Sequence, residues 1–401
     1  MKIGIYGGTF NPPHRGHLTA AAAVVSMLKL DKLLLIPASI PPHKALPEGS
    51  STAEQRLEMT RLAGEQLGLG GKVETLDIEL RRGGKSYTSD TLVELKALYP
   101  DDELWLLMGA DMFLSFQTWH EPEKVASMAG IAAFGRTEED MEPLFSVQRD
   151  RLYHEYPDIQ IFTLTVPGVI DISSTELRER LAEGTGENLL PPAVYGYILR
   201  NHLYGTNADL KHLTLSQLRP VALSYLKHKR IPHVLGTEQE AIRLAERYGA
   251  DIEKARVAAL LHDCTKKLEM EEQLALCRKY GIELDELEQK ALKLLHAKTG
   301  AAIARDIYGV DDEIYSAIWW HTTGHADMTL LELSAVYAEN AAVLHGRITE
   351  LRRMVRLEPD RETARALQRR VEALLPLWRE ARSLARITAH YYDREAFGWH
   401  I

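Results

Sequence analysis

The hydrophobic pattern of this chain changes once, near residue 205, and that change constrains the fold most. Before it, short apolar runs alternate with segments of helical spacing. The pattern predicts strands at 3–6, 33–36, 73–78, 104–108, 131–134 and 159–166, and helices at 17–30, 53–67, 88–99 and 121–128. Such alternation favours right-handed βαβ units and a parallel sheet covered on both faces, with ligands bound at the carboxyl ends of the strands.

Beyond the change, helical segments follow one another without alternating strands. They are predicted at 217–227, 237–248, 252–262, 271–280, 284–295, 298–308, 313–321, 330–344 and 362–391. A length of 401 residues agrees with two or three domains at about 100–200 residues each. We therefore predict a multidomain protein: an α/β domain over 1–207, a boundary between 205 and 215, and an all-α domain over 216–401.

Charge and histidine are distributed unequally between these two domains. Residues 1–207 carry 19 Lys and Arg against 28 Asp and Glu, whereas 208–401 carry 29 of each, and the total charge is −9. Ten of the 16 histidines lie in the second part. A chain without a basic stripe is unsuited to nucleic acid, so we expect small ligands in local pockets.

The sequence also limits the compartment and the partners. No apolar run reaches the ~18 residues of a membrane helix, and the pairs Gly7-Gly8 and Pro12-Pro13 interrupt the first apolar segment, so we expect neither a membrane span nor a signal peptide. Cys264 and Cys277 cannot build a disulfide framework and suit a reducing cytoplasm. The Arg- and Glu-rich helical pattern over 347–392 is typical of a core-facing or partner-facing helix, so a homo-oligomer is a further hypothesis.

A phosphate site is predicted where the first strand ends. The strand runs into Gly7 and Gly8, whose backbone N–H groups can approach a phosphate closely, and a helix begins a few residues later. His14 and His17, three residues apart, can face the same anion as hydrogen-bond donors. The alternative is a turn with two surface histidines.

This region resembles a known family. Residues 9–17, which read TFNPPHRGH, resemble the HxGH signature of the nucleotidylyltransferase superfamily. Segments 40–44, 86–92, 109–111, 119–120, 172–178, 190–194 and 198–204 resemble the bacterial nicotinate-mononucleotide adenylyltransferases of NAD synthesis. The resemblance covers almost all of the first ~200 residues and implies a Rossmann-like parallel sheet.

The resemblance implies that a phosphate oxygen of nicotinate mononucleotide attacks the α-phosphorus of ATP and releases pyrophosphate. Because that phosphate has a second pKa near ~6, no strong base is required, and the protein aligns the groups and neutralises charge. His14, His17 and Lys44 are the implied catalytic residues, with Mg²⁺ carried by ATP.

The implied ATP-binding and substrate-binding residues are Gly7, Gly8, Thr9, Phe10, Ser86, Tyr87, Thr88, Asp90, Gly109, Asp111, Trp119, Arg136, Ser173, Ser174, Thr175 and Arg178. From the residues alone, the Ser173 cluster reads as a helix N-cap, and such a helix start is also an anion site. Trp119 is either a stacking surface for the pyridine ring or a core side chain. Arg178 alone would read as a surface charge, and Asp111 follows a strand where a carboxylate can bind ribose.

The sequence leaves one alternative substrate and one alternative nucleotide-binding motif to consider. A related enzyme family that adenylylates phosphopantetheine shares the HxGH loop, but the segment 86–88 and Trp119 argue against that substrate. Residues 83–86 read GGKS and mimic the end of a P-loop, but Glu79 stands where the first glycine of that motif belongs. A Walker site is therefore rejected.

The second domain contains a set of potential metal ligands: His233, His262, Asp263, His296, His321 and Glu339. Imidazoles and carboxylates together suit one or two divalent ions of the Fe, Mn or Co type. Each histidine alone would read as a core or surface residue. The pattern over 258–266 resembles the HD-domain metal-dependent phosphohydrolases.

Segments 233–237, 294–297 and 321–324 resemble the HD subfamily of symmetrical diadenosine-tetraphosphate hydrolases, which implies two ADP as products and a catalytic Asp263. Lys266 is either a phosphate contact or a solvated lysine. That family has Asp where this chain has Glu339, and the residues after it do not match. The alternative is therefore a non-catalytic regulatory module that binds a nucleotide.

Overall fold

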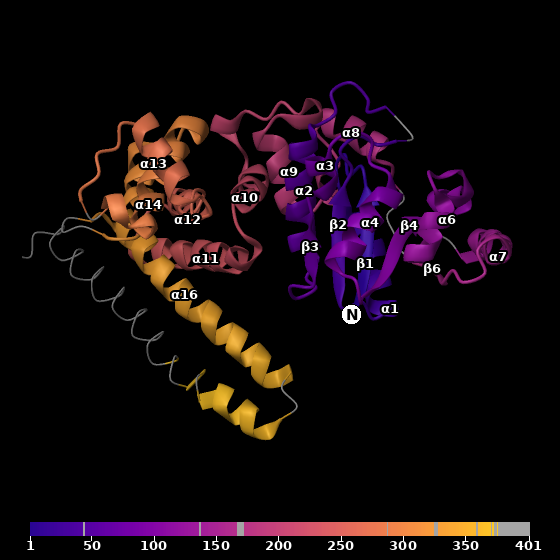
Figure 1. Cartoon of the computed structure of the whole chain (residues 1–401). Coiled ribbons are helices and arrows are strands. Elements are labelled where there is room, and N and C mark those ends of the chain that lie inside the picture. Colours follow the sequence, from indigo (N-terminus) through magenta and orange to yellow (C-terminus); the bar gives the residue numbers. More distant parts are fainter. Residues whose placement is uncertain are drawn as a thin grey trace, which may run out of the picture. The chain divides into compact units, whose positions relative to one another are not determined.

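The computed structural model describes residues 1–42, 45–135, 138–166, 172–286, 288–324, 328–357, 360–369, 371–372 and 375. The chain divides into two compact units, Met1–Ala208 and Asp209–Ile401 (Figure 1). None of the described helices combines the length and the apolar character needed to cross a membrane.

The first unit is built on a six-stranded parallel sheet. Its strands are β1 (Lys2–Gly8), β2 (Lys32–Pro37), β3 (Val73–Thr75), β4 (Glu103–Gly109), β5 (Gly130–Gly135) and β6 (Ile161–Thr165). The order is β3-β2-β1-β4-β5-β6, with Ile5 paired to Leu34 on one side and to Leu106 on the other. The predicted parallel sheet is confirmed, and its strand order reverses between β1 and β4, where ligands of such folds bind.

Helices cover both faces of this sheet. They are α1 (Arg15–Met27), α2 (Ala53–Glu65), α3 (Ile78–Arg82), α4 (Thr88–Leu98), α5 (Ala110–Leu114), α6 (Pro122–Met128), α7 (Glu138–Glu155), α8 (Ser174–Ala182) and α9 (Pro192–Arg200), with 3₁₀ turns η1 (Phe116–Thr118), η2 (Glu187–Leu189) and η3 (Leu203–Gly205). Neighbouring β2 residues belong to different apolar clusters, Leu34 to one and Leu33 and Leu35 to the other. Because successive strand residues face opposite sides, the sheet has a core on each face.

Two predictions for this unit are wrong in detail. The strand predicted over 73–78 ends at Thr75, and α3 begins at Ile78 after its N-cap Asp77. Gly83 ends α3 with a φ of 69°, which glycine adopts without a steric penalty. The helix α7 was not predicted, since Pro143 inside it reads as a helix breaker.

The second unit is helical throughout its described residues, as predicted. Its elements are η4 (Leu210–His212), α10 (Leu215–Ser224), η5 (His228–Arg230), α11 (Ile231–Tyr248), α12 (Ile252–Leu261), α13 (Met270–Lys279), η6 (Glu288–Lys290), α14 (Leu292–Tyr308), α15 (Asp312–Trp320) and α16 (Leu330–Leu357). Residues 361–369 are also helical. The helix α16 packs against α11, α12 and α15 (Figure 1), so residues far apart in sequence meet in one core.

Helix boundaries differ from the prediction at several places. The helix predicted over 330–344 continues as α16 to Leu357, and the one predicted over 217–227 is α10, Leu215–Ser224. Most of the helix predicted over 362–391 lies outside the described residues. In place of the helices predicted over 284–295 and 298–308 there is one helix, α14, which begins only at Leu292. In the turn before it, Asp285 and Glu288 each accept a hydrogen bond from the other's backbone N–H. No glycine or proline separates residues 295 and 298, so nothing ends the helix there. The helix predicted from residue 237 begins at Ile231, which places His233 on α11.

Candidate functional site

The loop after β1 folds over an aromatic cluster. Phe10 has a φ of 49° and a buried ring, which meets the rings of Tyr6 and His17 edge-on at centroid distances of 5.5 and 5.3 Å. A Cβ at Gly8 would lie 3.1 Å from the Phe10 ring, so a larger residue there would press on this ring and the position favours glycine. The carboxyl end of β1 therefore presents a short backbone loop directly to the point where the strand order reverses.

His14 and His17 are held together at the start of α1. His14 is its N-cap residue, the backbone N–H of His14 donates to Nδ1 of His17 at 3.2 Å, and the ring centroids lie 3.7 Å apart. Since Nδ1 of His17 accepts a hydrogen bond, the neutral ring carries its proton on Nε2. His17 can thus donate to an anion at the positive end of α1.

Arg56 is a structural residue of this site that sequence reasoning missed. Its side chain is 1 % exposed and donates to the carbonyl oxygens of Thr9 at 3.0 Å, Ala38 at 2.5 Å and Ser39 at 2.8 Å. It fixes the loops after β1 and β2 relative to each other. The one available signal was its spacing from Met59, three residues later on the buried face of α2.

The segment after β6 reaches the same loop. Ser173 caps α8 by accepting from the backbone N–H of Glu176 at 3.1 Å, and Ser174 begins the helix. Arg178 donates to the backbone carbonyl of Asn11 at 2.9 Å and to Oγ1 of Thr175 at 3.1 Å. The structure therefore brings the predicted residues after β6 to the loop after β1.

The end of β4 supplies the neighbouring edge. Gly109 ends the strand and is the N-cap of α5, and Asp111 is exposed in the first turn of that helix. Trp119 is half-buried, with its ring centroid 5.5 Å from that of Phe116 at 45°. Part of the Trp119 surface therefore packs against the core, as the alternative interpretation required, while the rest stays accessible.

The predicted substrate loop lies at the start of α4. The Ser86 hydroxyl accepts from the backbone N–H of Ser39 at 2.9 Å, so it fastens the loop to the end of β2. The Tyr87 ring lies 4.2 Å from that of His120, at 37°, and His120 had not been selected from the sequence. Thr88 and Asp90 occupy the first turn of α4.

Two predicted residues of this site, Lys44 and Arg136, lie outside the described residues.

The predicted metal ligands of the second unit meet in one cluster. His233 lies on α11, His262 and Asp263 at the end of α12, His296 on α14, His321 at the end of α15, and Glu339 on α16. Two groups have donor atoms within 4.8 Å of one another: His233, His262 and Glu339, and His262, Asp263 and His321.

Individual distances define the centre of the cluster. Oε2 of Glu339 lies 2.6 Å from Nε2 of His233 and 3.1 Å from Nε2 of His262. Nε2 of His296 lies 3.1 Å from Nε2 of His321 and 3.4 Å from Oδ1 of Asp263. All six side chains therefore point toward one small volume.

Backbone contacts orient three of the four histidines. Nδ1 of His262, His296 and His321 lies 2.6, 2.8 and 2.6 Å from a carbonyl oxygen three residues earlier. These carbonyl groups belong to Ala259, Lys293 and Ile318. An Nδ1–H that donates to the backbone leaves the Nε2 lone pair free to bind a metal.

Burial and mutual charge set the protonation of the cluster. Burial lowers the pKa of His262, but the Asp263 and Glu339 carboxylates outweigh it and raise the pKa to about 10. Burial, with the nearby His321, lowers the pKa of His296 to about 3, and burial, with the nearby His262, lowers that of His321 to about 4. His262 is therefore protonated between the ionised Asp263 and Glu339 carboxylates, whereas His296 and His321 are neutral imidazoles.

Two cations border the cluster. The Arg230 guanidinium forms ion pairs with Asp263 and with Oε1 of Glu339, the latter at 3.0 Å. Nζ of Lys266 lies 2.9 Å from Nε2 of His296, and burial lowers its pKa. Sequence reasoning weighed Lys266 but missed Arg230, although Arg230 precedes His233 by three residues and so shares its side of the helix start.

These residues fit a divalent ion. Among the described residues nothing hydrogen-bonds to Oδ1 of Asp263, although this atom is buried. A buried carboxylate oxygen without a partner is costly, and a cation at the centre would satisfy it. The imidazole and carboxylate donors are those that first-row transition metals prefer.

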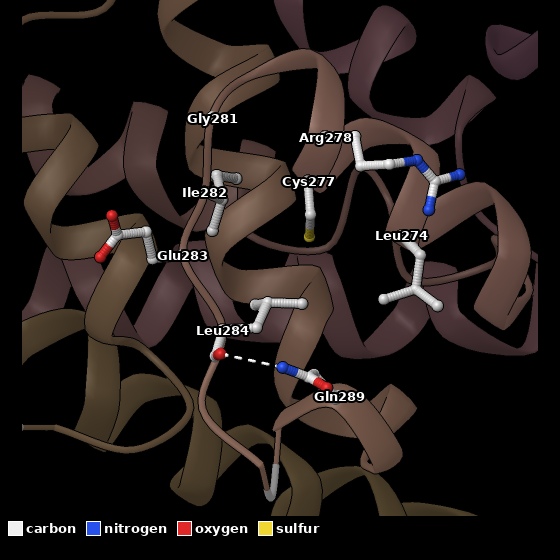
Figure 2. Close-up of a pocket in the computed structure, with 8 residues that line it drawn as sticks. All are labelled: Leu274, Cys277, Arg278, Gly281, Ile282, Glu283, Leu284 and Gln289. Atoms are coloured by element: carbon white, nitrogen blue, oxygen red, sulfur yellow. Dashed lines mark hydrogen bonds between the residues drawn. The ribbon is translucent and has the colours of Figure 1, made fainter.

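A separate cavity in this unit does not belong to the cluster. It measures about 530 Å³ and is lined by Leu274, Cys277, Arg278, Gly281, Ile282, Glu283, Leu284 and Gln289 (Figure 2). Gln289 donates to the carbonyl of Leu284 at 3.2 Å across one end. Burial raises the pKa of the Cys277 thiol, so this cysteine is a poor nucleophile.

Comparison with known families agrees with the division into two units. Residues 5–180 match the cytidylyltransferase-like family, and residues 230–369 match the HD domain. A probable nicotinate-nucleotide adenylyltransferase of Shewanella baltica (strain OS223) is 39 % identical over 220 residues, which cover 51 % of this chain and 99 % of that protein. One from Carboxydothermus hydrogenoformans is 40 % identical over 204 residues, covering 51 % and 98 %.

Solved structures similar to each unit are also known. A Plasmodium falciparum nicotinic acid mononucleotide adenylyltransferase complexed with NaAD is 19 % identical over 51 % of this chain and 98 % of its own, with a TM-score of 0.43. A predicted HD superfamily hydrolase involved in NAD metabolism from Clostridium acetobutylicum is 30 % identical over 36 % of this chain and 87 % of its own, with a TM-score of 0.31. On the sequence identity of its first half, the chain belongs to the nicotinate-nucleotide adenylyltransferase family, and it carries an HD domain in its second half.

Proposed function

We propose that the first unit transfers the adenylyl group of ATP to nicotinate mononucleotide. The His14–His17 pair carries this proposal, because it lies at the point of the sheet where strand order reverses and at the positive end of α1. A phosphate oxygen of the mononucleotide forms a bond to the α-phosphorus of ATP, and the bond from that phosphorus to the bridging oxygen of pyrophosphate breaks. The products are deamido-NAD and pyrophosphate.

The residues of the unit have separate roles in this proposal. His17 donates from Nε2 to phosphate oxygens and His14 assists it, while Gly7, Gly8, Thr9 and Phe10 form the loop beneath. Ser173, Ser174, Thr175 and Arg178 bind ATP phosphates, with Lys44 and Arg136 as further contacts. Gly109 and Asp111 border the ribose, and Ser86, Tyr87, Thr88, Asp90 and Trp119 bind the nicotinate end. Mg²⁺ enters with ATP.

Purified full-length protein tests the reaction with nicotinate mononucleotide and Mg-ATP. We expect deamido-NAD and pyrophosphate in equal amounts, and little product from phosphopantetheine. If no dinucleotide forms, the proposal fails. His17→Ala should lower turnover at least 100-fold, as loss of a donor to developing charge does elsewhere. His154→Ala, on an exposed position of α7, is the matched control and should keep wild-type turnover.

We further propose that the second unit hydrolyses a dinucleoside polyphosphate, with diadenosine tetraphosphate giving two ADP. Six converging imidazole and carboxylate side chains bordered by Arg230 and Lys266 support this, since cations beside a metal-ligand cluster suit a polyanionic substrate. When bound, one or two divalent ions of the Fe, Mn or Co type supply an activated water and neutralise phosphate oxygens.

The chain's own groups orient this reaction. His233, His262, Asp263, His296, His321 and Glu339 would hold the ions, and Asp263 would also accept a proton from the attacking water. The water oxygen forms a bond to phosphorus as the central P–O–P bridge breaks, so one ADP takes the water oxygen and the other leaves with the bridging oxygen. Arg230 and Lys266 neutralise the polyphosphate.

An assay with diadenosine tetraphosphate and Mn²⁺, Fe²⁺ or Co²⁺ tests this activity. We expect ADP as the product with at least one ion, and loss of both ADP formation and ion binding in Asp263→Asn. Asp306→Asn, at an exposed ion pair of α14, is the control and should change neither. If no ion supports ADP formation, the HD half is a non-catalytic nucleotide-binding module. A cytoplasmic location and a homo-oligomer stay predictions.

A further inference from the structure

A buried tyrosine near the end of the first unit reaches the loop that precedes the histidine pair. Tyr204 lies in η3, four residues before the unit ends, and is 7 % exposed. Its hydroxyl donates to Oδ1 of Asn11 at 2.8 Å and lies 2.7 Å from the hydroxyl of Ser51. The two residues are 193 positions apart in sequence, so this contact exists only in the folded unit.

Asn11 forms hydrogen bonds through its side-chain oxygen, its side-chain nitrogen and its backbone carbonyl. Oδ1 also accepts from the Ser51 hydroxyl at 3.0 Å, and Nδ2 donates to Oγ of Ser50 at 2.9 Å. The backbone carbonyl of Asn11 accepts from Arg178 at 2.9 Å. Because Asn11 is 2 % exposed and lies three residues before His14, its orientation determines the path by which the loop enters α1.

The turn that carries Tyr204 is strained, and packing maintains it. His202, Tyr204 and Gly205 have φ values of 50°, 57° and 74°, a left-handed region that is unfavourable for the two non-glycine residues. Burial raises the pKa of Tyr204 well above its usual range, so its hydroxyl stays protonated and donates. A strained turn that delivers one buried donor to a substrate loop is typical of a positioning device.

We propose that Tyr204 is a positioning residue for adenylyl transfer, which fixes Asn11 and thereby the loop that presents His14 and His17. The inference rests on the proposed function of the first unit. Without the Tyr204 hydroxyl, Oδ1 of Asn11 keeps one donor and the amide can turn, so the carbonyl that Arg178 holds can shift. Small displacements of aligned groups reduce the rate of a transfer step more than they reduce binding.

Tyr204→Phe in the full-length protein tests this, with nicotinate mononucleotide and Mg-ATP as substrates. We expect kcat to fall about tenfold, which corresponds to about 1.4 kcal/mol, while KM for nicotinate mononucleotide changes less than twofold. Hydrogen exchange of residues 9–17 should accelerate. Tyr99→Phe is the matched control: its hydroxyl accepts from Lys32 at 3.0 Å at the amino end of β2, away from the loop, and its loss should leave kcat unchanged.

The outcomes separate this inference from the proposed function. Absence of dinucleotide synthesis by the wild type contradicts the proposed function itself. An active wild type with unchanged kcat in Tyr204→Phe overturns the inference alone, as does an equal fall in kcat in Tyr99→Phe. If Tyr204→Phe fails to fold, Ser51→Ala replaces it: it removes the second donor to Asn11, and an unchanged kcat there overturns the inference.

Discussion

Replacing Arg56 by methionine should destabilise the first unit strongly, although Arg56 forms no ion pair among the described residues. Within the part of the chain that the structure describes, the guanidinium donates to three backbone carbonyl groups, those of Thr9, Ala38 and Ser39. Methionine fills a similar apolar volume but donates nothing. The loops after β1 and β2 would then lose the three hydrogen bonds by which the Arg56 side chain joins them.

The expected magnitude follows from the three carbonyl groups. An acceptor left without a partner costs about 1–3 kcal/mol when it stays buried. Burial of the guanidinium itself is costly, as the lowered pKa of Arg56 indicates, and its removal recovers part of the loss. If loop carbonyls regain water in part, the net loss is about 3 kcal/mol. For a unit of this size, that lowers the melting midpoint by about 6–12 °C.

Calorimetry of the full chain measures this loss of stability. Hydrogen exchange of the β1 and β4 peptides identifies which transition belongs to the first unit. Arg56→Lys is the control: it keeps the charge but lacks the planar fork, so its midpoint should lie between those of the wild type and of Arg56→Met. The expected fall in the melting midpoint of Arg56→Met is about 6–12 °C. A midpoint within about 1 °C of the wild type would refute the reasoning.

Two further predictions concern the first unit. Burial raises the pKa of Glu79, so its contribution to stability is present below the ordinary carboxyl pKa of about 4.3 and is lost as the pH rises through the raised value. Glu79→Gln, which still accepts from Thr91, should have a higher unfolding free energy than the wild type at pH 8 and an equal one near pH 4 in denaturant titrations. Gly205→Ala should destabilise more than Gly184→Ala: both have a positive φ, but only at Gly205 would the new Cβ meet the Cβ of Ala182, at 3.2 Å, which melting midpoints can compare.

The sequence predicted the elements whose signals are local and long. The strands β1, β2 and β4 are apolar runs next to glycine or proline, and most helices of the second unit have a clear helical period. The helix α3 has five residues, too few to display that period, although Asp77 before it and Gly83 after it are ordinary helix boundaries. The prediction assigned α14 to two helices, because its two apolar stretches each have a helical period of their own.

The candidate sites divide in a similar way. Histidines and glycines at fixed spacings were found from the sequence, because their chemistry is local. Arg56 and Arg230 were not, since an arginine in a helical pattern reads as a surface charge until the fold places carbonyl or carboxylate groups beside it. Tyr204 ends a segment that resembles the family, but nothing in the sequence indicates that its hydroxyl reaches Asn11, which lies 193 residues away.

Glu339 stands where the resemblance to HD hydrolases implied an aspartate, and the structure shows how far the longer side chain reaches from its helix. Its Oε2 reaches Nε2 of both His233 and His262, at 2.6 and 3.1 Å, from α16, which packs against α11. Shortening the side chain by one methylene withdraws the carboxylate by about 1.5 Å. Glu339→Asp should therefore weaken Mn²⁺ binding, measured by titration calorimetry, rather than restore a better site. Equal or tighter binding by the aspartate variant would show that α16 does not set the position of this ligand.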